Sequence, residues 1–252
     1  MSEQRARIET FRDGEAVARA AAEEFIRLAA RAIAERGFFA VALSGGSTPK
    51  RLYQILAEPE NRARVAWDKV HLFWGDERPV PPDHEESNYH MTNEALLSTL
   101  SLAADHVHRM PAARADHDAA AREHQEEIAN LFGVAVDGPP PSFDLVFLGM
   151  GPDGHTASLF PETAALAETE RWVVPNFVPK FDATRMTMTA PLINAAKEVL
   201  FLVVGESKTD RLVEVLEGPS DPDRLPSQRI KPTNGELVFY TDEAAVAKLS
   251  TK

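Results

Sequence analysis

The sequence contains no cysteine among its 252 residues, which excludes disulfides and thiolate metal sites. It also lacks an apolar run of about 18 residues, the length that a membrane-spanning helix needs. The stretch Met1–Arg12 alternates charges without the apolar segment of a signal peptide. We therefore expect neither a membrane span nor a signal peptide, and a cytoplasmic location.

Positive charge is also scarce. The chain has 27 Lys and Arg against 39 Asp and Glu, a formal net charge of -12. An acidic surface repels nucleic acid and anionic membrane, and no block of Lys and Arg offers a local exception. We expect neither as a partner. If the ligand is an anion, a few locally placed basic residues must bind it.

Strand and helix periods alternate along the whole chain, without an internal repeat or a break in composition. This alternation predicts an α/β fold, with one domain over residues 1–252 and a mostly parallel, twisted sheet flanked by helices. Residues 185–189 alternate Met and Thr, which indicates a half-exposed and antiparallel strand. The segment 217–233 is expected to be an irregular functional loop. Strands are expected at 38–43, 70–74, 143–148, 199–204 and 237–240, and helices at 15–35, 88–97, 116–131, 206–216 and after the last strand.

Three polar loops follow three of the expected strands. The first, Ser44-Gly45-Gly46-Ser47-Thr48, leads into a helix. Exposed N–H groups and hydroxyls at a helix start form a site for phosphate. The spacing is not that of a Walker loop, because the terminal Gly-Lys-Ser/Thr is missing. The alternative is an ordinary strand-to-helix turn in which Ser47 or Thr48 caps the helix.

The second loop, Gly75-Asp76-Glu77-Arg78, brings two carboxylates and a guanidinium to the end of a strand. Arginine suits bidentate binding of phosphate or carboxylate. The alternative is an ion pair at the edge of the sheet.

The third loop, Gly149–Thr156, is the most informative because it places Asp153 and His155 directly behind a buried strand. Ligands of open α/β sheets bind outside the carboxyl ends of the strands. The unperturbed pKa of histidine, ~6.5, suits proton transfer, and Asp153 could orient the imidazole. No G-x-S-x-G elbow is present, which disfavours a serine hydrolase. The alternative is a glycine turn with a surface histidine.

The other histidines do not predict a metal site. They are scattered and form no H-E-x-x-H motif. His117 and His124 could share one helix face, but a solvated face is the stronger interpretation. We therefore expect no metal and no cofactor.

The order of these loops resembles that of the 6-phosphogluconolactonases, sugar-phosphate lactonases of the pentose phosphate pathway, in the family that includes glucosamine-6-phosphate isomerases. The resemblance extends from about Phe39 to Tyr240. Its most specific parts are GDER together with GMGPDGHTASLFP, whereas the late LPSQ is weaker. The matching segments are LSGGSTPKRLY from Leu43, WGDERPVPPDHEESNY from Trp74, FDLVFLGMGPDGHTASLFP from Phe143, RMTMTAPLINAAKEVLFLVVGESK from Arg185 and LPSQRI from Leu225.

The resemblance implies a Rossmann-like fold similar to that of glucosamine-6-phosphate deaminases and ribose-5-phosphate isomerases. Those deaminases carry an acid five residues after the histidine of their own Asp-Gly-His. Here that position is Phe160, which cannot exchange a proton with a substrate amine. The sequence therefore favours the lactonase over the deaminase.

The implied reaction is metal-independent hydrolysis of 6-phospho-D-glucono-1,5-lactone, by a monomer or weak dimer. His155 would be the general base, Asp153 would position it, and Arg78 would bind either the oxyanion or the phosphate. The phosphate itself would lie at the first loop. The expected substrate-binding residues are Ser44, Gly45, Gly46, Ser47, Thr48, Arg185, Lys208 and Gln228, with Arg229 beside the last of these.

Two alternatives remain open at this point. Lys208 and Arg185 could be ordinary surface charges. The whole chain could be a non-catalytic sugar-phosphate sensor, although a sensor would not need His155.

Overall fold

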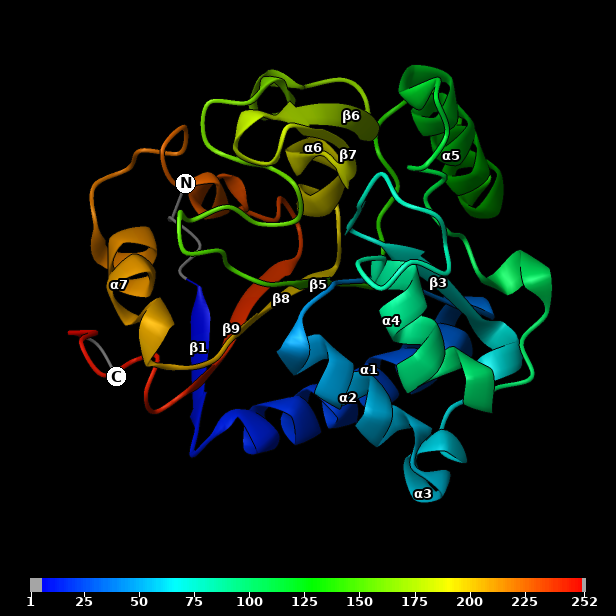
Figure 1. Cartoon of the computed structure of the whole chain (residues 1–252). Coiled ribbons are helices and arrows are strands. Elements are labelled where there is room, and N and C mark those ends of the chain that lie inside the picture. Colours follow the sequence, from blue (N-terminus) through cyan, green and yellow to red (C-terminus); the bar gives the residue numbers. More distant parts are fainter. Residues whose placement is uncertain (1–5, 251–252) are drawn as a thin grey trace.

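The computed structural model describes residues 6–250. Its centre is a six-stranded sheet in the order β1-β9-β8-β5-β2-β3, in which every neighbouring pair is parallel. Figure 1 shows helices on both sides of this sheet, so the predicted α/β fold with a mostly parallel sheet is confirmed. The strands are β1 (Arg7–Phe11), β2 (Phe39–Leu43), β3 (Val70–Trp74), β5 (Leu145–Leu148), β8 (Glu198–Val203) and β9 (Glu236–Asp242).

A smaller antiparallel sheet joins β4 (Asp76–Glu77), β7 (Ala183–Met188) and β6 (Val173–Val178). The antiparallel pairing predicted for residues 185–189 is therefore confirmed for 185–188, which belong to β7. The half exposure predicted with it is wrong, because residues 186–189 are buried between the small sheet and the core. Gly75 connects the two sheets, since its N–H donates to Leu43 O and its carbonyl accepts from Met188 N, each at 2.8 Å.

The two longest helices begin and end where the sequence provides caps. Asp13 accepts a hydrogen bond from Ala16 N at the start of α1, and Gly37, at φ 90°, ends that helix in the left-handed conformation. Asp116 caps α5 in the same way. The helices are α1 (Gly14–Arg36), α2 (Ser47–Ala57), α3 (Pro59–Arg62), α4 (Asn88–Ala95), α5 (His117–Phe132), α6 (Ala190–Asn194) and α7 (Thr209–Glu217).

The sheet is buried on both faces, which explains its continuous apolar strands. In β2, Val41 and Leu43 pack with α1 and α2 on one face, while Ala40 and Ala42 face the core around α5 and α6. The small alanines leave room there for large side chains such as Phe73. No helix within residues 6–250 is both long enough and apolar enough to cross a membrane.

Several elements differ from the sequence-based expectation. The helix expected after β9 is wrong, because residues 243–248 form turns. The sequence does not predict the strands β1, β4 and β6 or the short helices α3 and α6. β1 is a half-exposed edge strand whose partner β9 lies more than 200 residues away, so its alternating charges gave no apolar signal.

The strand order decides where the polar loops lie. β3, β2, β5 and β8 are consecutive neighbours in the sheet, and all run in the same direction. The segments that follow them therefore gather at one edge, outside the carboxyl ends of the strands.

Candidate active site

Asp153 and His155 form a hydrogen-bonded pair in the loop after β5. Asp153 Oδ1 contacts His155 Nδ1 and also accepts the backbone N–H of His155 at 3.2 Å. An ionised carboxylate only accepts hydrogen bonds, so this contact assigns the proton of neutral His155 to Nδ1. Nε2 is then the basic nitrogen. The imidazole is partly exposed, as proton exchange with a ligand requires.

Glycines shape this loop for close approach. A Cβ atom at Gly151 would lie 2.0 Å from His155 Nδ1, so only glycine leaves room for the imidazole. Gly154 has φ +81°, a conformation that favours glycine, and a Cβ there would lie 2.8 Å from Leu225 Cδ2. The glycines of the loop thus leave the space that the histidine ring occupies.

The surroundings of the pair keep Asp153 ionised. Partial burial alone would raise the pKa of its carboxyl, but the hydrogen bond and charge of His155, with a contribution from Lys180, hold that pKa well below its ordinary value. Lys180 Nζ lies 3.4 Å from Asp153 Oδ2. The carboxylate is therefore a hydrogen-bond acceptor across the neutral pH range.

A chain of polar contacts joins the three loops that the sequence singled out. The Asn88 side chain lies against Gly45, where a Cβ would meet its Oδ1 at 1.9 Å. Asn88 Nδ2 donates to the carbonyl oxygen of Asp76 at 2.9 Å, and the Asp76 carboxylate accepts from Ser158 Oγ at 2.6 Å. Asp76 thus ties the Gly45 loop to the segment that follows His155.

Glu77 is a structural residue of the second loop. Its buried carboxylate accepts the Ser87 hydroxyl and the backbone N–H groups of Arg78, Asn88 and Tyr89. Burial raises its pKa although these hydrogen bonds oppose that effect. Glu77 therefore fixes the long loop between β4 and α4.

Two arginines lie together at this edge. β4 and β7 pair Glu77 with Met186, so Arg78, the residue after Glu77, and Arg185, the residue before Met186, adjoin the same pair. Arg78 donates to the carbonyl of Glu86, and its buried Nε has no partner among the described residues. Burial lowers the pKa of Arg185, Asp76 opposes that effect, and the charge of Arg78 adds to it.

Arg185 also lies close to His155, because both side chains contact the ring of Phe160. Its guanidinium lies over Phe181 at 4.6 Å and over Phe160 at 5.5 Å from the ring centroids. Phe160 in turn stacks on the His155 imidazole. Lys208 approaches from β8, and its Nζ donates to Met150 O at 2.9 Å.

The first loop provides a helix N-terminus. α2 begins at Ser47, with Gly46 as its N-cap and no side-chain capping bond, so the alternative that Ser47 or Thr48 caps the helix is wrong. Its first N–H groups are therefore not used by a capping side chain. Gly46 and Ser47 are exposed, whereas Ser44 is buried and its Oγ has no partner within residues 6–250.

Gln228 and Arg229 have structural contacts. Gln228 Nε2 donates to the carbonyls of Glu214, Val215 and Pro219, and its Oε1 accepts from Asp221 N. Arg229 contacts the Asp223 carboxylate and the Pro222 carbonyl. The structure therefore does not bring the Gln228 amide to the Asp153–His155 pair, and its role toward substrate stays a prediction.

Residues that sequence reasoning missed complete the site. Lys180 lies at the turn between β6 and β7, and Asn88 lies at the start of α4. Neither has a local signal, since their contacts depend on segments far away in the chain. The described residues contain no group of three or more His, Asp or Glu side chains that could hold a metal ion.

The chain is similar over most of its length to proteins of one family. Residues 12–239 match the profile of the family described as "Glucosamine-6-phosphate isomerases/6-phosphogluconolactonase". A 6-phosphogluconolactonase of Synechocystis sp. is 45% identical over 215 residues, which cover 85% of this chain and 86% of the relative. A Nostoc sp. 6-phosphogluconolactonase is 42% identical over 219 residues, covering 87% and 88%.

A solved structure is similar over nearly the whole chain. The 6-phosphogluconolactonase from Trypanosoma cruzi superimposes with a TM-score of 0.84 at 30% identity, covering 99% of this chain and 98% of that one. The profile, the relatives and the fold agree, and this chain belongs to the glucosamine-6-phosphate isomerase/6-phosphogluconolactonase family.

Proposed function

We propose that this protein hydrolyses 6-phospho-D-glucono-1,5-lactone to 6-phosphogluconate, with His155 as general base. The observation that carries the proposal is the hydrogen bond between Asp153 and His155 Nδ1, which leaves Nε2 basic at the carboxyl edge of the sheet. The lactonases that are 45% and 42% identical over most of their length support the choice of substrate.

The reaction requires one proton to move twice. Nε2 of His155 takes a proton from water as the water oxygen bonds to the lactone carbonyl carbon, which produces a tetrahedral oxyanion. The bond between that carbon and the ring oxygen then breaks, and the imidazolium returns the proton to the ring oxygen. Asp153 stabilises the imidazolium between these steps, because its carboxylate remains ionised. A lactone is an activated ester, so no covalent intermediate is needed.

The charges around the pair fit an anionic substrate on an acidic protein. We propose that the phosphate binds at the N-terminus of α2, where residues 45–48 present backbone N–H groups, while the N–H of Ser44 donates to the Tyr53 hydroxyl. Arg78, Arg185 and Lys208 supply positive charge around it. Donors of this kind can also stabilise the oxyanion, and loss of one such donor typically costs ~3–4 kcal/mol of barrier.

The test is the loss of freshly prepared lactone, followed beside its spontaneous background after treatment of the enzyme with chelator. We expect fast hydrolysis by the wild type and a loss of about 10²- to 10⁴-fold in His155→Ala. His117→Ala, which removes a histidine on α5, is the matched control and should retain activity. Wild-type hydrolysis no faster than background would overturn the proposal and leave sugar-phosphate binding without catalysis as the function to test.

We further propose that the protein is a monomer or a weak dimer. The described residues expose only four large hydrophobic side chains, Val134, Val136, Phe177 and Phe181. Large stable interfaces usually bury more apolar surface than these can offer. Light scattering across a range of protein concentrations tests this, and a concentration-independent dimer would contradict it.

A further inference from the structure

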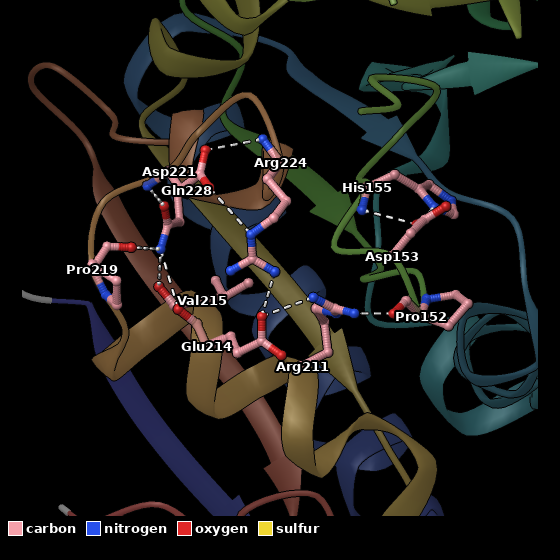
Figure 2. A network of polar contacts seen from close by, with 10 residues as sticks. All are labelled: Pro152, Asp153, His155, Arg211, Glu214, Val215, Pro219, Asp221, Arg224 and Gln228. Atoms are coloured by element: carbon pink, nitrogen blue, oxygen red, sulfur yellow. Dashed lines mark hydrogen bonds and ion pairs between the residues drawn. The ribbon is translucent and has the colours of Figure 1, made fainter. Parts of the chain in front are cut away.

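Two carbonyl groups of the loop that carries the Asp153–His155 pair are held by residues outside that loop. Arg211 Nε donates to Pro152 O at 2.9 Å. Ser227 donates twice to Gly154 O, from its backbone N at 2.9 Å and from its Oγ at 2.8 Å. Figure 2 shows Arg211 reaching from α7 to Pro152, next to Asp153 and His155.

The positions of these two carbonyls are specific. The Pro152 carbonyl belongs to the peptide group that leads into Asp153, and the Gly154 carbonyl to the one that leads into His155. Each member of the pair is therefore preceded by a peptide group that an external donor fixes. Since a peptide group is planar, fixing its carbonyl also fixes the direction in which the next residue starts.

Ser227 is rigidly placed for this contact. It lies in the short 3-10 helix Pro226–Arg229 and is 2% exposed. Leu225, just before that helix, is fully buried and packs against Gly154 so closely that a Cβ there would clash. The LPSQ motif, which contains the expected substrate-binding residue Gln228, thus packs on the outside of the histidine loop.

Arg211 is anchored by a network behind it. Its Nη1 pairs with Glu214 at 2.9 Å, and Glu214 also accepts from Arg224 Nη1 at 2.6 Å. Arg224 Nε continues to Asp221 at 3.1 Å. Figure 2 shows these contacts joining α7 to the segment 219–230. The Gln228 amide points toward Pro219 and Val215, away from His155. The network therefore connects Arg211 to the segment 219–230, which also contains Ser227.

We propose that Ser227 and Arg211 are positioning residues for His155, and that the segment 219–230 serves as a support for the histidine loop. They hold the Asp153 carboxylate against Nδ1, so that the proton stays there and Nε2 stays free to accept one from water. This inference rests on the proposed lactonase activity for its kinetic readout, but the tautomer of His155 can be read without activity.

The kinetic test compares Ser227→Ala and Arg211→Gln with Arg224→Gln. Arg224→Gln makes the same chemical change in the same network, but Arg224 is two contacts further from Pro152, beyond Glu214. We expect Ser227→Ala and Arg211→Gln to lower kcat about 10- to 100-fold with KM changed less than about twofold, because misplacement of a general base affects the chemical step. Arg224→Gln should stay within about twofold of the wild type, and Arg211→Lys should recover part of the loss.

The spectroscopic test is the pair of imidazole ¹⁵N resonances of His155, assigned by their absence in His155→Ala. In wild type they should report a proton on Nδ1, and in Ser227→Ala a mixture of both tautomers. Thermal unfolding confirms that each variant folds. Should Ser227→Ala fail to fold, Arg211→Gln carries the test, since that side chain is partly exposed.

The outcomes separate the two proposals. Wild-type hydrolysis at background rate overturns the lactonase, while the resonances still test the positioning. Folded variants with wild-type kcat, pH–rate profile and His155 resonances overturn the positioning. A raised KM with unchanged kcat also overturns it, because that result assigns the segment 219–230 to substrate binding.

Discussion

The imidazole of His155 stacks on the ring of Phe160, with 4.0 Å between the centroids and 26° between the planes. Phe160 is 2% exposed, so its ring offers a fixed surface for the histidine. This is the position at which the related deaminases were expected to carry an acid. In this chain the aromatic ring packs against His155, the proposed general base, and we expect it to orient the imidazole.

We therefore expect Phe160→Leu to lower kcat/KM about 3- to 10-fold, because an aromatic pair contributes about 0.5–1.5 kcal/mol beyond its buried area. The measurement is steady-state lactone hydrolysis. Phe177→Leu is the matched control, since Phe177 is 53% exposed on β6. Equal activity of the two variants would contradict the orienting role of Phe160.

Gly151→Ala should reduce kcat at least about 100-fold, because the new Cβ would lie 2.0 Å from His155 Nδ1 and displace the ring. Gly149→Ala makes the same change in the same loop, where a Cβ would meet nothing within 4 Å. That control should keep near wild-type activity. Comparable activity in both alanine variants would show that the imidazole does not occupy the place described.

A cluster of histidines at the start of β3 should make the free energy of unfolding depend on pH. His71 Nδ1 lies 3.0 Å from His108 Nε2, and its ring stacks on His106 with 4.4 Å between centroids. Burial, with these two imidazoles, lowers the pKa of His71 from 6.5 to about 4. Between those values the unfolded chain binds the proton more strongly, so the free energy of unfolding should fall as pH decreases from about 6.5 to 4.

His71→Gln should remove this part of the acid sensitivity, whereas His84→Gln, which replaces an exposed histidine, should not. Urea unfolding at pH 7, 6 and 5 gives the measurement. A His71→Gln protein that loses stability toward pH 5 as steeply as the wild type would be inconsistent with the cluster as the cause.

Glu198 should affect the free energy of unfolding in the opposite direction, lowering it as pH rises. Burial and the adjacent Glu24 raise the pKa of its carboxyl to about 8. The folded state then holds a proton that the unfolded chain releases above about pH 4.5, so stability should fall as pH rises from about 4.5 to 8. Glu198→Gln removes this loss and should raise the free energy of unfolding at pH 8 while changing little near pH 5.

The control for this prediction is the residue paired with Glu198 on the next strand. Glu236 is opposite Glu198 in the β8–β9 register, but its side chain is 66% exposed. Glu236→Gln should change stability by less than about 0.5 kcal/mol at either pH. If Glu198→Gln proved less stable than the wild type at pH 8, the carboxyl would be a needed charge partner rather than a protonated group.

Much of the fold could be predicted because its signals are local. The buried run of β3 has the same bounds in the sequence-based prediction and in the structure, and α1 and α5 differ by one residue at either end. β1 and the turns after β9 could not be predicted in this way. Their conformation depends on pairing between the two ends of the chain, which no window of neighbouring residues records.

In the candidate site, too, some features follow from the local sequence and others only from the tertiary structure. The sequence by itself determined that Asp153 and His155 share one glycine loop, that the aromatic Phe160 stands five residues after His155, and that polar loops follow the strands. Only the tertiary structure decided what those loops touch. Lys180, Ser227 and Arg211 reach the histidine loop from segments 27 to 73 residues away, and the Gln228 amide turns into its own loop. The local sequence contains the proposed reacting groups, but packing between distant segments sets the directions of their side chains.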